Sequence, residues 1–219
     1  MSEHKSQNLS RVEIFGFEAL FYEELLTFLS LGLYPKLIRK ILKDFRIKPN
    51  SKILEFGGGT CYNDLILLKI HKGKLRFTCI DVSHDMIKKA KWNTRKFREY
   101  FEFINARFEE RISRFKGVFD YVIMVFVMHG LYDGIKEKAI ENAYFYLKEG
   151  GEFLIVDYNR FDVKKRSCPL RFFMEKIECP LAVQFLRYPL EKVLKKAGFR
   201  ETEHRFYARD IIRFTRARK

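Results

Sequence analysis

Short apolar runs alternate with helical patterns along this chain of 219 residues. Apolar runs at 53–56, 75–80 and 101–104 end at glycines, an aspartate and an asparagine, and a fourth spans 119–126. The fourth run is almost unbroken, which is typical of a central strand that is buried on both faces. Strands that alternate with helices predict a doubly wound α/β fold with a mostly parallel sheet.

A run of three glycines separates the first predicted strand from a helical pattern that begins near residue 64. Gly57, Gly58 and Gly59 carry no Cβ, so the backbone of this turn can approach a ligand closely. Tyr62 stands where a dinucleotide fingerprint needs a third small residue, and no Gly-Lys-Ser/Thr follows. The turn therefore indicates a nucleoside-like ligand rather than a pyrophosphate.

Two acids lie at the predicted carboxyl ends of adjacent strands. Glu55 comes just before the glycines, where a carboxylate would repel phosphate and favour a cation. Asp81 lies 24 residues after Gly57, near the spacing of about 20 expected for a ribose-binding acid. Ser83 is a predicted helix N-cap, and Met86 would lie either against an adenine ring or in the core.

These segments resemble the class I S-adenosylmethionine-dependent methyltransferases. Residues 55–59 are similar to the first motif of that family, Asp/Glu-x-Gly-x-Gly, and residues 80–86 resemble its second motif. Residues 147–157 and 190–199 resemble its fifth strand and last helix, with Gly198 as the helix cap. The resemblance implies a Rossmann-like sheet of seven strands, closed by an antiparallel pair at 203–207 and 211–215.

The same resemblance implies S-adenosyl-L-methionine as cofactor and S-adenosyl-L-homocysteine as product. The expected cofactor contacts are Tyr22, Glu55, Gly57, Gly58, Gly59, Asp81, Val82, Met86, Asn105, Ala106 and Val125. Asn105 replaces the usual aspartate and can still accept a hydrogen bond from adenine, although asparagine also commonly ends a strand. Cys61 replaces the usual third glycine, which leaves open a non-catalytic adenosyl-binding protein.

His129 is the candidate catalytic residue, either as a general base or by orienting the substrate. A structural histidine is the equal alternative. Methyl transfer requires mainly alignment and exclusion of water, because the cofactor supplies the electrophile. Residues 125–128 lack the Asn/Asp-Pro-Pro-Tyr/Phe segment of related base-modifying enzymes, which counts against methylation of adenine or cytosine amino groups.

A single domain is expected, because folds of this class reach about 200–250 residues in one unit. Its predicted segments are a flexible start (1–14), a helical cap (15–48), a cofactor-binding core (49–158), a variable substrate lid (159–189) and a C-terminal helix with a strand pair (190–219). The cap reads as two helices broken near Gly32 and Pro35. It resembles the ubiquinone/menaquinone-biosynthesis methyltransferases, where an aromatic residue placed like Tyr22 closes the pocket.

The proposed acceptor class rests on the predicted lid, which is apolar, basic and broken by prolines. Such a segment suits a small or lipid-like acceptor, for example a quinone-like molecule. The net charge of +15 also favours an anionic partner, either RNA or an acidic membrane surface, unless it reflects surface composition alone. RNA or protein methylation is therefore the alternative activity.

The remaining expectations concern location and metals. The sequence contains no 18-residue apolar stretch, and its polar start lacks the apolar region of a secretory signal, so a cytoplasmic location is expected. The four cysteines lack the close pairing typical of zinc sites, so no metal site is expected. Cys61 and Cys79 are interpreted as small apolar groups in the core, and pairing of Cys168 with Cys179 is disfavoured in a reducing compartment.

Overall fold

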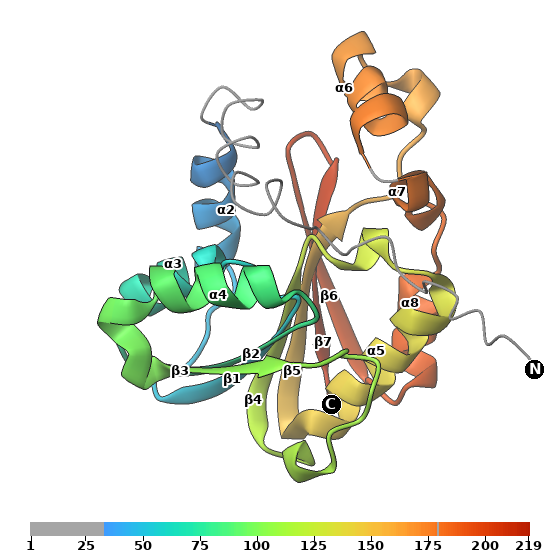
Figure 1. Cartoon of the computed structure of the whole chain (residues 1–219). Coiled ribbons are helices and arrows are strands. Elements are labelled where there is room, and N and C mark those ends of the chain that lie inside the picture. The colour runs from blue at the N-terminus through green and yellow to red at the C-terminus, as the bar shows by residue number, and fades with distance from the viewer. Residues whose placement is uncertain (1–32, 179) are drawn as a thin grey trace, which may run out of the picture.

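The computed structural model describes residues 33–178 and 180–219. Its centre is a seven-stranded sheet in the order β3-β2-β1-β4-β5-β7-β6 (Figure 1). Strands β1 to β5 are parallel, whereas β7 is antiparallel to both β5 and β6. This topology confirms the predicted fold, including the terminal strand pair. The strands are β1 (Ser51–Phe56), β2 (Leu75–Asp81), β3 (Phe101–Asn105), β4 (Phe119–Val125), β5 (Leu147–Tyr158), β6 (Glu201–Tyr207) and β7 (Ile212–Arg218).

Helices cover both faces of the sheet (Figure 1). One face packs against α2 and α3 and the other against α5 and α8, and each side has its own apolar core. The α-helices are α2 (Leu33–Lys43), α3 (Tyr62–Ile70), α4 (His84–Asn93), α5 (Asp133–Tyr146), α6 (Cys168–Phe172), α7 (Pro180–Phe185) and α8 (Leu190–Lys196). The shorter turns are η1 (Arg95–Tyr100), η2 (Ser113–Phe115), η3 (Met128–Gly130), η4 (Val163–Lys165) and the π-helix η5 (Phe173–Ile177).

The connection from β3 to β4 runs without an α-helix and is held by side chains of α5. The Tyr146 hydroxyl accepts a hydrogen bond from the Ile112 backbone N–H at 2.8 Å, and the Asn142 amide donates to the Phe108 carbonyl at 3.0 Å. Tyr146 also packs edge-on against Phe56 of β1 in the fully buried core. These bonds satisfy backbone groups that a helix would otherwise pair internally.

Two local elements bear on the sequence prediction. Helix α2 is described from Leu33 and continues through Pro35 without a break, whereas Gly32, the other position of the predicted break, lies outside the described residues. The proposed preceding helix, with Tyr22, lies outside the described residues. Strand β5 begins at Leu147 and therefore includes Gly150. The φ of +73° at Gly150, which glycine adopts without strain, allows the chain to turn within this strand.

The predicted C-terminal cap of the last helix is confirmed. Gly198 follows α8 with a φ of +108°, and its N–H donates to the Lys195 carbonyl at 3.1 Å. A side chain at this position would also meet Tyr144, because an added Cβ would lie 2.8 Å from its ring.

Residues 159–189 form short helices rather than an open loop. Elements α6, η5 and α7 stand beside the carboxyl ends of the strands, at the upper right of Figure 1. Val163, Met174, Ala182 and Leu186 bury a small apolar core of their own within this segment. Among the helices of 33–178 and 180–219, none combines the length and the apolar character needed to cross a bilayer.

Candidate cofactor and active site

The glycine turn connects β1 to α3 and is hydrogen-bonded to the end of β2. Gly57 has a φ of +68°, and its N–H donates to the Ile80 carbonyl at 2.9 Å. An added Cβ at Gly57 would lie 2.7 Å from Val127, whereas one at Gly59 would have no atom of the described chain within 4 Å. Gly57 is thus required for packing, and Gly59 faces the open space where a ligand can approach.

Asp81 ties the turn to the end of β2. Its Oδ2 accepts a hydrogen bond from Gly59 N–H at 2.9 Å, and its Oδ1 accepts one from Ser83 N–H at 2.8 Å. Burial raises the pKa of this carboxyl, and the backbone donors oppose that rise. Ser83 in turn caps α4, as predicted, by accepting from Met86 N–H at 3.3 Å. The carboxylate is therefore held at the rim of the turn.

Asn105 lies next to Asp81, with which it pairs in the register of β2 and β3. Its amide nitrogen donates to the carbonyls of Asp81 and Val82 at 3.0 and 2.9 Å. Because the nitrogen is engaged, the amide oxygen remains to accept a hydrogen bond. The side chain is exposed, while Val82 and Ala106 beside it are half-buried.

The other expected contacts line the same edge of the sheet or lie below it. Val125 ends β4 and Met86 lies in the first turn of α4, and both are largely buried. Glu55 differs from the expected exposed carboxylate, because it is only 2% exposed and lies beneath the turn. Burial and the neighbouring charge of Asp64 raise the pKa of Glu55 well above its usual range. Buried beneath the glycine turn, the carboxylate of Glu55 is not placed to attract a cationic ligand directly.

Comparison with known proteins agrees with this geometry. Residues 54–153 match the family described as "Methyltransferase domain". The carboxy-S-adenosyl-L-methionine synthase of Nautilia profundicola is 30% identical over an aligned length of 181 residues, and the match covers 74% of this chain and 75% of that protein. The chain belongs to the class I methyltransferase family.

Two further comparisons define the extent of the similarity. A SAM-dependent methyltransferase structure from Aquifex aeolicus has a TM-score of 0.61 at 21% identity, and the match covers 83% of this chain and 88% of that one. The squalestatin tetraketide synthase clz2 of Cochliobolus lunatus is 28% identical over an aligned length of 163 residues, and the match covers 69% of this chain. The chain spans only 6% of the length of that synthase. These similarities do not distinguish the quinone-biosynthesis branch from other branches of the family.

His129 of this methyltransferase-family chain lies in η3, where it is 7% exposed and bracketed by two carboxylates. Its Nδ1 is 2.8 Å from Asp157 Oδ1, and its Nε2 is 3.6 Å from Glu178 Oε1. Burial lowers the pKa of His129, but attraction to Asp157 and Glu178 outweighs burial and raises the pKa to about 10. The ring is therefore protonated at neutral pH, a state that suits orientation better than proton abstraction.

Sequence reasoning missed the partners of His129. Asp157 lies within the buried end of β5, and its carboxylate also accepts from His129 N–H at 3.0 Å. Glu178 comes from the 159–189 segment and accepts a hydrogen bond from the Tyr158 hydroxyl. An acid near the carboxyl end of a strand, the same signal that identified Asp81, could have found Asp157. Nothing in the spacing indicates Glu178.

We expect the His129 contacts to make stability depend on alkaline pH. Because the pKa of folded His129 lies above its ordinary value of 6.5, its contribution is fully present below about pH 6.5 and lost as pH rises through about 10. Urea unfolding between pH 6 and about 10 should therefore show a steeper loss of stability for the wild type than for His129→Gln. His204→Gln is the control, because burial lowers the pKa of His204, so its titration cannot cause a loss of stability as pH rises. Parallel pH profiles for the wild type and His129→Gln would contradict the assignment.

Proposed function

We propose that this chain transfers a methyl group from S-adenosyl-L-methionine to a small or lipid-like acceptor, releasing S-adenosyl-L-homocysteine. The observation that carries the proposal is the hydrogen bond of Gly59 to Asp81, which fixes an open backbone turn beside an ordered carboxylate. Asp81 can accept both ribose hydroxyls, and the oxygen of Asn105 can accept from the adenine amino group. Val82, Met86, Ala106 and Val125 would contribute apolar contacts around the adenosyl group.

The chemistry in this proposal is a displacement at the sulfonium methyl. The cofactor supplies the electrophile, so the protein acts by aligning the acceptor and excluding water. His129 would orient the acceptor or the 159–189 segment, because its imidazolium is shared between Asp157 and Glu178. The cap at 15–48, with Tyr22, is proposed to close the cofactor pocket.

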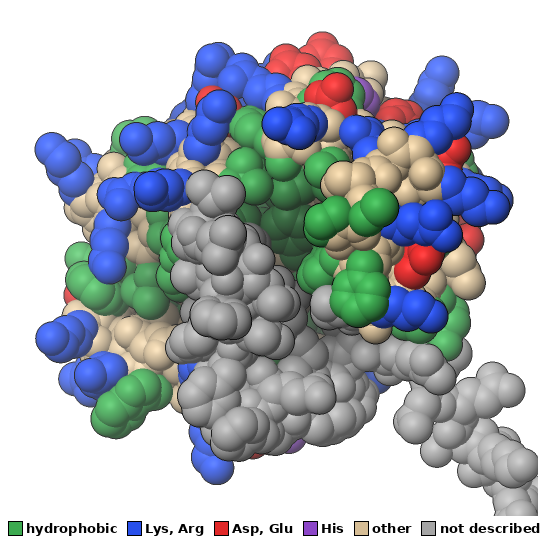
Figure 2. Space-filling view, turned by 90° about the horizontal axis from the view of Figure 1, so that it is seen from above, with side chains coloured by type: hydrophobic (Ala, Val, Ile, Leu, Met, Phe, Trp, Pro, Cys, Tyr) green, Lys and Arg blue, Asp and Glu red, His purple; other side chains and the backbone are tan. Residues whose placement is uncertain are grey.

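The face at the carboxyl ends of the strands supports an apolar acceptor. In Figure 2 this face is hollowed, with hydrophobic side chains in the hollow and lysines and arginines around it. Phe126 and Tyr158, at the ends of β4 and β5, bring their ring centroids within 5.9 Å. Phe172 of α6, in the lid segment, is 60% exposed. We infer that 159–189 selects an apolar, partly anionic acceptor such as a quinone-like molecule.

The relative from Nautilia profundicola suggests a second candidate. Its name describes synthesis of carboxy-S-adenosyl-L-methionine, a reaction on the cofactor itself rather than on a separate acceptor. This chain, which is 30% identical to that protein, would then use the same crevice to join the cofactor methyl carbon to a carboxyl group. That carboxyl group would come from a co-substrate acid that decarboxylates, and the methyl carbon would give up one proton. The masses of the products separate the two reactions.

Calorimetry with S-adenosylmethionine, followed by product mass spectrometry, tests the proposal. We expect binding at about one site per chain, and with hydroxylated quinones or catechols about one S-adenosylhomocysteine per methylated product. In a parallel reaction with a decarboxylating acid as carboxyl donor, a heavier, carboxylated cofactor would favour the second candidate. Binding without turnover across a broad acceptor panel would favour a non-catalytic adenosyl-binding protein, and no binding by the wild type would refute the proposal.

An anionic macromolecular partner is the remaining alternative. A depression of about 720 Å³ at the opposite edge of the sheet is lined by basic side chains, namely Arg111, Lys116, Lys148 and Lys219, with Glu141 and Glu149 among them. Filter binding of RNA over a salt series distinguishes this alternative, because contacts to phosphates give a steep decrease of affinity with salt. We expect weak, sequence-independent RNA binding, since Figure 2 shows basic side chains scattered over the visible face rather than in one patch.

A further inference from the structure

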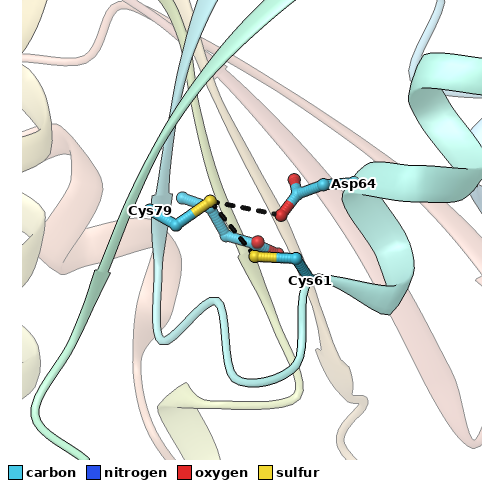
Figure 3. A group of neighbouring side chains, drawn as sticks. Cys61, Asp64 and Cys79 are labelled. Atoms are coloured by element: carbon cyan, nitrogen blue, oxygen red, sulfur yellow. Dashed lines mark hydrogen bonds between the residues drawn. The ribbon is translucent and has the colours of Figure 1, made fainter. Parts of the chain in front are cut away.

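We propose that the side chains of β1, β2 and α3 beneath the glycine turn form a binding site for a divalent metal ion, with Zn²⁺ as the best match. The site is a buried cluster of Glu55, Cys61, Asp64 and Cys79. Figure 3 shows the Cys61 and Cys79 thiols and the Asp64 carboxylate pointing toward one another. This proposal is independent of the methyl-transfer reaction.

The geometry of the buried cluster suits one small cation. One ligand atom from each of the four residues lies within 4.8 Å of all the others. The two sulfurs are 3.3 Å apart, and Cys79 Sγ is 3.5 Å from Asp64 Oδ2. Two thiolates bound at about 2.3 Å to a tetrahedral Zn²⁺ lie roughly 3.8 Å apart, so a small outward movement of the sulfurs would admit the ion.

Two carboxyl oxygens of the buried cluster lack the partners that burial demands. Asp64 is 0% exposed, and its Oδ1 and the Oε2 of Glu55 have no hydrogen-bond donor in the described chain. No lysine, arginine or histidine within 33–178 and 180–219 forms an ion pair with either carboxyl. A buried acid without a partner is costly, and a cation bound between the two carboxyls would satisfy both orphaned oxygens.

The backbone at Cys61 supports a role for its thiol. Cys61 has a φ of +58° and a ψ of +28°, the left-handed conformation in which glycine is favoured over any other residue. A strained non-glycine residue persists where its side chain is required, which makes the thiol a functional candidate. Cys61 is buried, with 1% of the residue exposed, and its sulfur lies against that of Cys79.

The donor set also indicates the class of metal. Two thiolates select borderline-soft cations such as Zn²⁺ over Mg²⁺ and Ca²⁺, and two carboxylates complete a four-coordinate set. On binding, the thiol protons pass to solvent and the sulfurs bind as thiolates. All four positions come from the protein, so the ion would be structural. Gly58 lies next to the cluster, because a Cβ added there would be 3.0 Å from Glu55 Oε2. The bound ion would therefore stabilise the glycine turn.

Two other states of the same residues are the competing outcomes. Without a cation, burial and neighbouring charge raise the pKa of Glu55 and of Cys79 well above their usual ranges, so the cluster would be a protonated network. Alternatively, Cys61 and Cys79 could lose two electrons and two protons to an oxidant and form a disulfide. Metal analysis and thiol counting separate these states from the proposed site.

The test is to unfold the full chain and refold it with reductant and either Zn²⁺ or Co²⁺, because the buried cluster is closed in the folded state. After desalting, we expect about one metal ion per chain, and for Co²⁺ the thiolate charge-transfer and intense ligand-field bands of a tetrahedral site. A chelator should then lower the unfolding temperature of the wild type. Refolded wild type that retains no metal would overturn the proposal, as would a Cys61–Cys79 disulfide that persists in metal-loaded protein.

Three variants sharpen this test. Cys61→Gly should fold, because glycine suits the left-handed backbone at that position, and should lose the ion together with the sensitivity to chelator. Cys79→Ser should also lose the thiolate bands. Cys168→Ser is the matched control, because Cys168 is an exposed free cysteine far from the cluster in sequence, and it should bind metal like the wild type. Full metal retention by Cys61→Gly and Cys79→Ser would contradict the assignment of ligands.

Discussion

Replacing Asp81 with alanine should weaken S-adenosylmethionine binding by about 10- to 100-fold. The substitution removes an acceptor for the ribose hydroxyls, and hydrogen bonds to a charged group contribute about 1.5–3 kcal/mol. It also removes the partner of Gly59 N–H and Ser83 N–H, so the turn would lose its link to β2. Isothermal titration calorimetry with the purified chain measures the effect directly.

Asp85→Ala is the matched control for this prediction. Asp85 is an exposed acid in the first turn of α4, four residues after Asp81, and no described contact ties it to the turn. Its loss should leave cofactor affinity within about twofold of the wild type, since surface substitutions rarely cost more than about 0.5 kcal/mol. If Asp81→Ala bound the cofactor as tightly as the wild type, Asp81 would not bind the ribose, and the proposed cofactor site would be refuted.

Alanine at Gly57 should act mainly on stability, whereas alanine at Gly59 should act mainly on cofactor binding. Gly57→Ala should lower the free energy of unfolding by about 2–4 kcal/mol, because it combines positive-φ strain with an overpacked contact to Val127. Gly59→Ala should cost only about 1–2 kcal/mol of stability, from strain alone. Its methyl group would instead face the open side of the turn and weaken cofactor binding by tenfold or more, as about 1.4 kcal/mol corresponds to tenfold.

Urea unfolding and calorimetry on the same preparations separate the two effects. Gly134→Ala is the control, because Gly134 lies within α5 at ordinary φ with open space around it, and alanine there should be neutral or slightly stabilising. If Gly59→Ala bound the cofactor as tightly as the wild type, the open side of the turn would not be the ligand side. If Gly57→Ala were as stable as the wild type, Val127 would have to move freely.

The pattern of apolar residues along the chain predicted the fold well, because their spacing itself indicates which segments form strands and helices. The buried run at 119–125 is the central strand β4, and the glycines at 57–59 end β1 as expected. Helix α4 begins after its predicted N-cap, because a serine accepting from the N–H three residues later stabilises that start. These are local interactions, set by neighbours within a few residues.

The candidate site was predictable in part for the same reason. Asp81, Asn105 and the glycines lie at strand ends, and parallel strands bring their carboxyl ends to one edge, so their proximity follows from topology. The surroundings of Glu55 did not follow. Its position in the motif indicated a ligand-facing acid, whereas the pleat of β1 directs it toward Cys79 on β2 and away from the crevice.

The sequence by itself was therefore sufficient to predict the strands, the helix caps and the cofactor edge of this methyltransferase-family chain. Each of these depends on the periodicity of apolar residues or on hydrogen bonds between residues that are close in sequence. The buried cluster and the carboxylates around His129 required the folded molecule. Cys61 and Cys79 are separated by 18 positions, and His129 is 28 from Asp157, so neither contact leaves a spacing signal. Such contacts arise where distant segments pack, and packing in turn determines which acids keep a proton and which can hold a metal ion.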